Sequence, residues 1–177
     1  MLGYVDTAHY TYGELSNEIN AETGGIACGV EVFDRADSVD EYRAFFGVKG
    51  KVMYPKMDVI FRMIREILNT SDVTDTRRLH EIISRVKSRA QSSLVSAGHS
   101  TAVLRAASYA SPMAAFQDGM AGIAYYQFIE KLDREFDDRK EEIIENLKSL
   151  MVEILRPENL CISYTGERES LDSVQKQ

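Results

Sequence analysis

The spacing of apolar and polar positions changes several times along the chain, and each change predicts a new element. Thr11 and Glu14 have the spacing of a capping box, and apolar residues at helical spacing follow them. The glycine pair at 24–25 is expected to end this first helix. Apolar residues then alternate with polar or small ones over 26–32 and again over 42–52. This alternation predicts two β-strands that pair as a hairpin.

After Pro55 the apolar residues recur every three or four positions, which predicts a mainly helical region. The expected helical stretches are 57–68, 79–94, 102–115, 123–136 and 140–155. Pro112 follows Ser111 inside the third stretch and is expected to start a new helix there, because proline is tolerated in a first turn. Beyond the last helix, apolar and polar residues alternate again over 160–165, which predicts a final short strand.

This order of elements is typical of an α+β fold with a largely antiparallel sheet and helices packed on one face. Three strands are few for so many helical residues, which indicates that a strand is missing. We expect one α+β domain over 1–166 and a flexible tail over 167–177. No stretch of about 18 apolar residues occurs, so no membrane-spanning segment is expected.

The composition narrows the class of protein. The chain has 177 residues, of which 44% are hydrophobic and 28% charged, and this excludes an intrinsically disordered chain or a disulfide-dense scaffold. The formal net charge of −7 argues against non-specific nucleic-acid binding. A basic run from Arg77 to Arg105 is either a solvated helix face or a wall that meets an acidic partner. Cys28 and Cys161 are expected as buried free thiols in a reducing, cytoplasmic compartment. A disulfide between them is an alternative that their spacing does not support.

The histidines do not form a zinc-binding motif. The chain has three of them, His9, His80 and His99, and the inverted motif HxxEH occurs at none. His80 and Glu81 match the start of HExxH, but Ser84 stands where the second histidine is required. The sequence therefore predicts no metal ligand and no catalytic residue. An independent metal enzyme that uses His80, Glu81 and acidic neighbours is left open.

Other polar and glycine positions are expected to have structural roles. Ser100 is adjacent to His99, but neighbouring positions do not make a catalytic triad. We expect Ser100 to cap the following helix and His99 to be packed in the turn before it. Gly119 and Gly122 lack the spacing of a phosphate-binding loop and are expected to allow close helix packing. The acidic residues over 130–142 are expected to form a solvated helix face.

Three groups of residues are more specific than any of these motifs. They are Tyr12–Asn20 with Thr23–Ile26, then Ser92–Ser100 with Arg105–Ser108 and Ser111–Pro112, and finally Leu160–Gly166. Together they resemble the pitrilysin/insulinase-type zinc metallopeptidases, and most closely the presequence-protease subfamily. The likeness runs over nearly the whole chain, from Leu2 to Gly166.

The resemblance implies a role inside a larger protein. Members of the subfamily resemble a clamshell in which two halves, each of two homologous α+β domains, enclose a chamber for unfolded peptides. The resemblance implies that the first domain carries the HxxEH zinc motif and that the last domain supplies an Arg and a Tyr to the active site. The present chain resembles the third domain with its associated helical segment, which carries neither set. The resemblance therefore implies a non-catalytic chamber-wall domain of a zinc-dependent metalloendopeptidase.

No catalytic or metal-binding residue can be carried over to this chain, and zinc is implied only for the intact enzyme. Gly98, His99, Ser100 and Arg105 can be carried over only as family-signature positions of unknown role. The implied partners are the other domains of the same polypeptide and, in the intact enzyme, unfolded peptide substrates. Neither a nucleic acid nor a membrane is expected as a partner.

The resemblance also implies that the chain is truncated at its N-terminus. Family members place a first strand and a first helix before the segment that matches Leu2, and these are expected to be missing here. An uncovered sheet edge or apolar face would favour self-association of the fragment. The main alternative is a free-standing binding or assembly module of the same fold with no peptidase activity.

Overall fold

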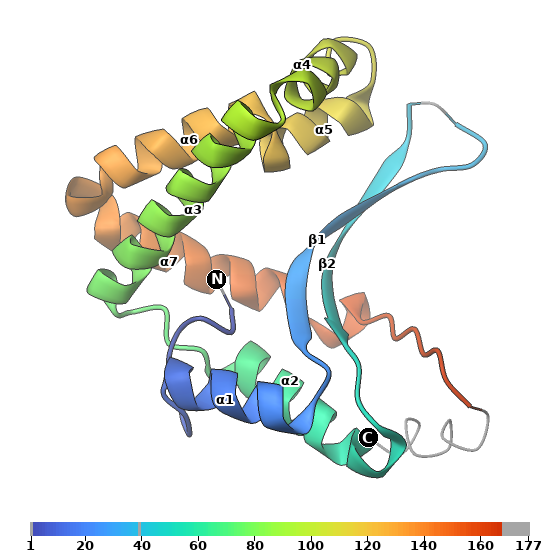
Figure 1. Ribbon diagram of the computed structural model, residues 1–177, viewed down its shortest axis with the longest axis vertical. Helices are drawn as coiled ribbons and strands as arrows, with labels where there is room; N and C mark the ends of the chain where they lie inside the picture. Colours follow the sequence, from blue (N-terminus) through green and yellow to red (C-terminus); the bar gives the residue numbers. More distant parts are fainter. Residues whose placement is uncertain (1, 39, 168–177) are drawn as a thin grey trace. The chain divides into compact units, whose positions relative to one another are not determined.

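A computed structural model describes residues 2–38 and 40–167 of the chain (Figure 1). In this part, seven α-helices and two short 3-10 helices accompany one antiparallel sheet of two strands. The α-helices are α1 (Tyr12–Glu22), α2 (Met57–Thr70), α3 (Thr76–Ser96), α4 (Gly98–Ala107), α5 (Pro112–Ala121), α6 (Ile123–Arg134) and α7 (Phe136–Ile154). The strands are β1 (Ile26–Asp34) and β2 (Tyr42–Gly50), and the 3-10 helices are η1 (Tyr54–Lys56) and η2 (Pro157–Asn159). The predicted α+β class is confirmed.

The chain divides into two compact units, which are described separately. Within the described residues, the first unit comprises 2–29, 46–75 and 143–167, and the second unit comprises 30–38, 40–45 and 76–142. The strands β1 and β2 and the helix α7 each contribute residues to both units. The single domain expected over 1–166 stays a prediction. The expected tail, 167–177, lies outside the described residues except for Glu167.

The core of the first unit forms where α1, α2 and the beginning of β1 meet. Leu15 of α1 and Met63 and Ile67 of α2 are almost fully buried. Ile26 and Cys28 of β1 pack against this cluster. Fully burying an apolar side chain of this size stabilises a fold by about 1.5–3 kcal/mol. In this unit, helices therefore pack against the hairpin, as the sequence pattern predicts.

The start and the end of α1 are determined locally. The Thr11 side chain accepts a hydrogen bond from the Glu14 backbone N–H at 3.3 Å, and Glu14 Oε2 accepts one from the Thr11 N–H at 2.9 Å. This confirms the predicted capping box. After the helix, Gly25 has a φ of 106°, a value that favours glycine. The Gly24 N–H donates to the Lys51 carbonyl at 2.7 Å, so the turn leads directly into the hairpin.

The second unit is built mainly of helices. α3 contacts α4 and α6, and α5 also contacts α4 and α6 (Figure 1). Its buried apolar side chains are Leu79, Ile82, Ile83, Ala114, Ile129 and Phe136. Tyr42 of β2 and Phe116 of α5 place their ring centroids 5.2 Å apart. An aromatic contact therefore joins the hairpin residues of this unit to its helices.

The predicted helical region after Pro55 is confirmed, with α2, α3, α6 and α7 over the expected stretches. The break between α4 and α5 also falls where it was expected. Ser111 Oγ accepts a hydrogen bond from the Ala114 N–H at 3.3 Å, and Pro112 is the first residue of α5. None of the helices in the described residues is long and apolar enough to cross a membrane.

The predicted final strand over 160–165 is wrong. These residues follow η2 without strand structure, and Leu160 and Ile162 are 71% and 60% exposed. A strand needs a neighbouring strand for its backbone hydrogen bonds, and the sheet in the described residues contains only β1 and β2. Cys161 is consequently exposed, which corrects the expectation that both thiols are buried. Cys28 is half-buried, and this burial raises the pKa of its thiol.

Candidate functional site

The signature positions Gly98, His99 and Ser100 form the first turn of α4, and all three are exposed. The N-cap of α4 is Ala97, which makes no side-chain cap bond. Two expectations are therefore wrong, because Ser100 lies inside the helix instead of capping it and His99 is exposed instead of packed in a turn. A Cβ atom at position 98 would meet no atom within 4 Å, so packing within this chain does not require the glycine.

Arg105, the fourth signature position, belongs to a polar network that joins α4 to α5 and α6. Its Nη1 donates to Asp118 Oδ2 at 2.7 Å, and only 3% of the Asp118 side chain is exposed. Asp118 Oδ1 accepts a hydrogen bond from the Ile123 N–H at the start of α6, at 3.1 Å. The bond to Asp118 raises the pKa of Arg105, whose guanidinium also lies 5.3 Å from the ring centroid of Tyr109. These contacts connect α4, α5 and α6, and both carboxylate oxygens of the buried Asp118 accept a hydrogen bond.

A glycine beside this carboxylate makes the network possible. A Cβ atom at position 122 would overlap Asp118 Oδ1 and would lie 3.0 Å from Asp118 Cα. The Gly122 N–H donates to the Asp118 carbonyl at 3.0 Å. Close packing at Gly122 is therefore confirmed, with a carboxylate as the neighbour. At Gly119 a Cβ atom would meet nothing within 4 Å, so the same expectation is wrong there.

A second, partly buried carboxylate, Asp133 of α6, joins that helix to α3. Ser84 Oγ donates to Asp133 Oδ1 at 2.5 Å, Lys87 forms an ion pair with Oδ2, and His80 Nε2 lies 3.4 Å from Oδ1. Burial raises the pKa of Asp133, but the hydrogen bonds from Lys87 and Ser84 outweigh burial and lower the pKa below its usual value. The side chain of Asp133 is 12% exposed, which corrects the expectation that the whole acidic run over 130–142 is solvated.

An open groove of about 640 Å³ lies beside this cluster in the second unit. Its lining residues are Thr76, Arg77, His80, Glu81, Ser84, Arg85, Phe136, Asp137 and Lys140. The His80 ring stacks on Phe136 with centroids 4.5 Å apart. An activated serine needs a base that accepts its proton, but Ser84 donates to a carboxylate whose lowered pKa makes it a weak base. The groove therefore does not present an activated nucleophile.

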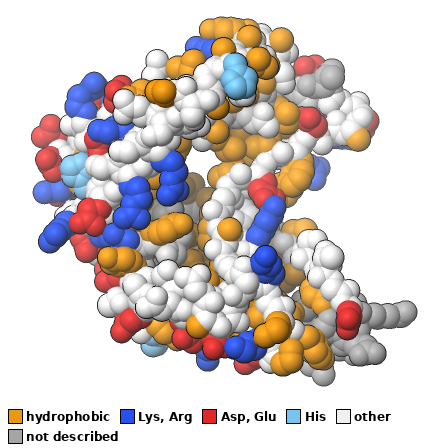
Figure 2. Space-filling view, in the orientation of Figure 1, with side chains coloured by type: hydrophobic (Ala, Val, Ile, Leu, Met, Phe, Trp, Pro, Cys, Tyr) orange, Lys and Arg blue, Asp and Glu red, His pale blue; other side chains and the backbone are white. Residues whose placement is uncertain are grey.

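The groove residues also do not converge on a metal position. The Glu81 carboxylate lies 3.5 Å from Arg77 Nε and 3.2 Å from Arg78 Nη1, whereas His80 faces Asp133. Among residues 2–38 and 40–167, no group of three or more His, Cys, Asp or Glu side chains could hold a metal ion. Figure 2 shows basic and acidic side chains mixed over α3, and much of the basic run predicted there is paired within the unit.

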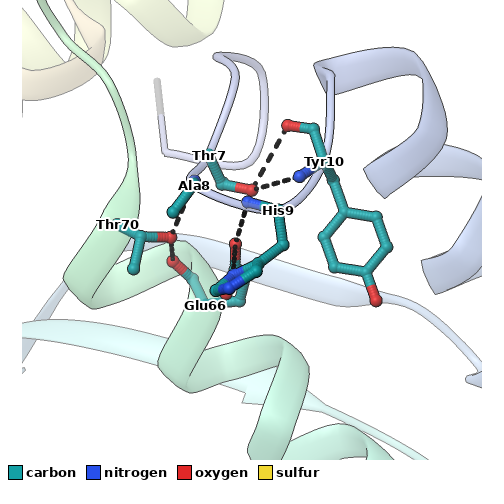
Figure 3. Close-up of polar contacts among 6 residues, drawn as sticks. All are labelled: Thr7, Ala8, His9, Tyr10, Glu66 and Thr70. Atoms are coloured by element: carbon teal, nitrogen blue, oxygen red, sulfur yellow. Dashed lines mark hydrogen bonds and ion pairs between the residues drawn. The ribbon is translucent and has the colours of Figure 1, made fainter.

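The first unit has a polar cluster around Glu66 of α2 (Figure 3). Glu66 Oε1 accepts a hydrogen bond from the His9 N–H at 3.0 Å, and His9 Nδ1 lies 2.9 Å from Oε2. Thr70 Oγ1 accepts a bond from the Ala8 N–H at 3.3 Å. Burial raises the pKa of Glu66, but hydrogen bonds from Thr7, His9 and Thr70 outweigh burial and lower the pKa to about 2. The cluster attaches the loop before α1 to α2.

The three carboxylates at the centres of these networks were missed by the sequence analysis. Asp118 lies four residues after the buried Ala114, and Asp133 lies four residues after Ile129 and three before Phe136. An acidic residue three or four positions from buried apolar residues of a helix lies on the same, inward face of that helix. This spacing was the signal in the sequence that could have identified Asp118 and Asp133. Glu66 has a weaker signal of this kind, since two of its partners, Thr7 and His9, lie in a distant loop.

Comparison with known proteins gives consistent matches. The model of a family described as peptidase M16 (subfamily C) associated matches residues 1–132. Protein HypA of Clostridium perfringens is 30% identical over 173 residues, which is 98% of this chain. The mitochondrial presequence protease of Yarrowia lipolytica is 27% identical over 150 residues, 84% of this chain. Presequence protease 1, chloroplastic/mitochondrial, of Arabidopsis thaliana is 26% identical over 173 residues, 96% of this chain.

The curated relatives are much longer than this chain. The matched region spans 18% of the Clostridium perfringens protein, 15% of the Yarrowia lipolytica protein and 16% of the Arabidopsis thaliana protein. In each relative, more than four fifths of the polypeptide lies outside the part that this chain resembles.

Proposed function

Because the chain belongs to the family associated with subfamily C of the M16 peptidases, we propose that it is a non-catalytic wall domain of a longer, zinc-dependent metalloendopeptidase that degrades unfolded peptides. The observation that carries the proposal is the family match over residues 1–132. Two of the compared relatives are named presequence proteases, and they match 84% and 96% of the chain.

The side-chain networks support a structural role for the chain. The buried Asp118 and the partly buried Asp133 are engaged by basic side chains and hydrogen-bond donors of neighbouring helices. Such pairs hold helices in register, whereas a catalytic carboxylate must be free to exchange a proton or contact a substrate. A wall domain of this kind would contribute confinement and orientation of the peptide.

The described residues do not fit a zinc site, because no three ligands converge among them. The proposal therefore assigns the zinc of the peptidase to other parts of the longer polypeptide, and it routes no step of the reaction through this chain. The other domains of that polypeptide are its proposed partners, and unfolded peptides are the proposed substrates of the intact protein.

The mass of the native polypeptide tests the proposal. A mass near 110 kDa is expected, since this chain of 20.0 kDa corresponds to 18% of the Clostridium perfringens relative. The native protein should cleave an unfolded peptide, and a chelator should stop the cleavage. The 177-residue chain alone should leave the same peptide intact.

Two results would contradict the proposal. Chelator-sensitive cleavage by the isolated chain would show that catalysis does not need the rest of the polypeptide. A native mass near 20 kDa would favour the alternative, a free-standing binding or assembly module. The cytoplasmic location stays a prediction, and the two presequence proteases compared above are by name mitochondrial or chloroplastic.

A further inference from the structure

One segment of the second unit is almost free of charge. Between Arg89 and Asp118, residues 90–117 contain a single Lys, Arg, Asp or Glu, which is Arg105. At the average of the chain, where 28% of residues are charged, a segment of this length would carry about eight charges. We call residues 90–117 the low-charge segment. It comprises the end of α3, the whole of α4 and the first half of α5.

The low-charge segment is nevertheless largely exposed. Val95, Val103 and Tyr109 are 83%, 69% and 79% exposed, and most alanine and serine residues around them are also exposed. Figure 2 shows mainly hydrophobic and uncharged side chains at the top of the view, where α4 and α5 lie in Figure 1. Water-facing helices normally carry charges on their outer face, whereas the core of a protein interface is depleted of charges.

Two of the signature positions, Arg105 and Gly98, do not explain the surface of the segment. The charge of Arg105 is compensated within the unit by Asp118 at 2.7 Å. Gly98 is exposed and has neither a positive φ nor a neighbour that a Cβ atom would meet. A glycine that the chain's own packing does not require suits a place where another backbone approaches closely.

We propose that the low-charge segment is the surface through which this chain docks on another domain of the same longer polypeptide. The inference rests on the proposed function. The occupant is expected to be uncharged and mainly apolar, because a charge placed against Val95, Val103 and Tyr109 would lose water without gaining a partner.

The length of the relatives and the type of surface favour an intramolecular occupant. More than four fifths of each compared relative lies outside the matched region, so a large protein surface is available in the same chain. Obligate interfaces are more hydrophobic than transient ones, and a domain of the same polypeptide is always present at a high effective concentration. Small residues on α4 also allow the backbone of a neighbouring domain to come close.

Thiol labelling at two matched positions tests the inference. Val103→Cys lies in the low-charge segment, and Val152→Cys lies on the charge-rich helix α7; both valines are 69% exposed. Each variant is made in the 177-residue chain and in the native longer polypeptide. A maleimide is added, and labelling of the peptide that contains the new thiol is followed by mass spectrometry. Thermal unfolding of the short variants verifies that they fold.

In the short chain, the two thiols should react at similar rates at low and high protein concentration. In the longer polypeptide, the thiol at position 103 should react at least tenfold more slowly than in the short chain, and the thiol at position 152 should be less affected. Equal rates at position 103 in both proteins, or equal protection at both positions, would overturn the inference. Protection in the short chain that grows with concentration would show a second copy as the occupant and would also overturn it.

The two proposals fail in different ways. A native polypeptide of about 20 kDa would remove the proposed function before any labelling is done. A long polypeptide in which the thiol at position 103 stays reactive would leave the proposed function standing and would reject only the docking surface. A peptide substrate as occupant would appear as protection only when unfolded peptide is added to the longer polypeptide, and this result would also reject the inference.

Discussion

At the scale of single residues, two carboxylates of the second unit, the buried Asp118 and the partly buried Asp133, connect neighbouring helices. Asp118 is held by Arg105 and by the Ile123 N–H, and Asp133 is held by Ser84 and Lys87. Burying a carboxylate is costly unless charges and hydrogen bonds compensate it. In the second unit, residues from other helices bind both carboxylates, so each network depends on how those helices pack. Substituting a residue of a network therefore tests that packing.

The network of Arg105 gives a prediction with an asymmetric outcome. Arg105→Ala should destabilise the 177-residue chain, because it leaves a carboxylate that is 3% exposed without its cation. Asp118→Asn should cost less, since the Arg105 side chain is 41% exposed and can be solvated, while an amide oxygen can still accept from the Ile123 N–H. Urea unfolding measures both losses, and equal losses would argue against this account.

The cluster at Glu66 predicts a pH dependence of stability. The pKa of Glu66 is about 2 in the folded chain against an ordinary value of 4.5. Because folding lowers this pKa, the contribution of Glu66 is complete above pH 4.5 and is lost as the pH falls from about 4.5 toward 2. Glu66→Gln should therefore destabilise the chain at pH 6 and have a smaller effect at pH 3, as measured by urea unfolding at both values.

A carboxylate outside such a cluster provides the control for this experiment. Glu145 of α7 is exposed, and Glu145→Gln should change the stability little at either pH. A loss at Glu66→Gln that is the same at pH 6 and pH 3 would show that the substitution acts through packing and not through the charge of the carboxylate.

At the scale of elements, the sequence predicted the start of a helix correctly where a capping residue or a proline is present. Thr11 and Glu14 form the capping box of α1, and Ser111 with Pro112 starts α5. The start of α4 has no side-chain cap, and there the expected boundary and the expected role of Ser100 were both wrong. A strand signal was also insufficient at 160–165, because alternation does not supply a partner strand.

The two serines provide a matched test of this distinction. Ser111→Ala removes the acceptor for the Ala114 N–H and should destabilise the chain by about 1 kcal/mol. Ser100→Ala is the same substitution inside α4 at an exposed position and should change the stability by less than about 0.5 kcal/mol. Thermal or urea unfolding compares the two variants. A larger loss at Ser100 would restore its interpretation as a cap.

At the scale of the whole molecule, charge is distributed in a way that local structure does not explain. The chain is 28% charged, yet residues 90–117 carry one charged side chain and are largely exposed. Ordinary solvated helices, such as α7 with its many acidic and basic residues, do not have this property. The docking proposal explains the low-charge segment by contact with the remainder of a longer protein.

The metal content of the isolated chain is a prediction at this scale. Since no group of three metal-ligating side chains converges among the described residues, the purified 177-residue chain should contain far less than one zinc per molecule. Adding a chelator should leave its unfolding temperature unchanged, because a structural metal would otherwise stabilise the fold on binding. Metal analysis and a thermal unfolding scan measure these two quantities. Stoichiometric zinc would favour the metal enzyme based on His80 and Glu81.

The sequence by itself determined the features that depend on neighbouring residues. The α+β order of elements, the capping box at Thr11 and the helix start at Pro112 follow from periodicity and from hydrogen bonds that span three or four residues. The three residue groups that resemble presequence proteases also indicated the family, and the family model that matches residues 1–132 then confirmed it. These features do not depend on the tertiary structure, because the interacting groups are close along the chain.

Only the tertiary structure decided which polar residues act together. Ser84 lies 49 residues from Asp133 and His9 lies 57 residues from Glu66, and spacing cannot pair residues at such separations. It also decided that Cys161 and His99 are exposed, since burial depends on whether another element covers a position. Local order was therefore readable from the sequence, while burial and long-range pairing were settled by packing.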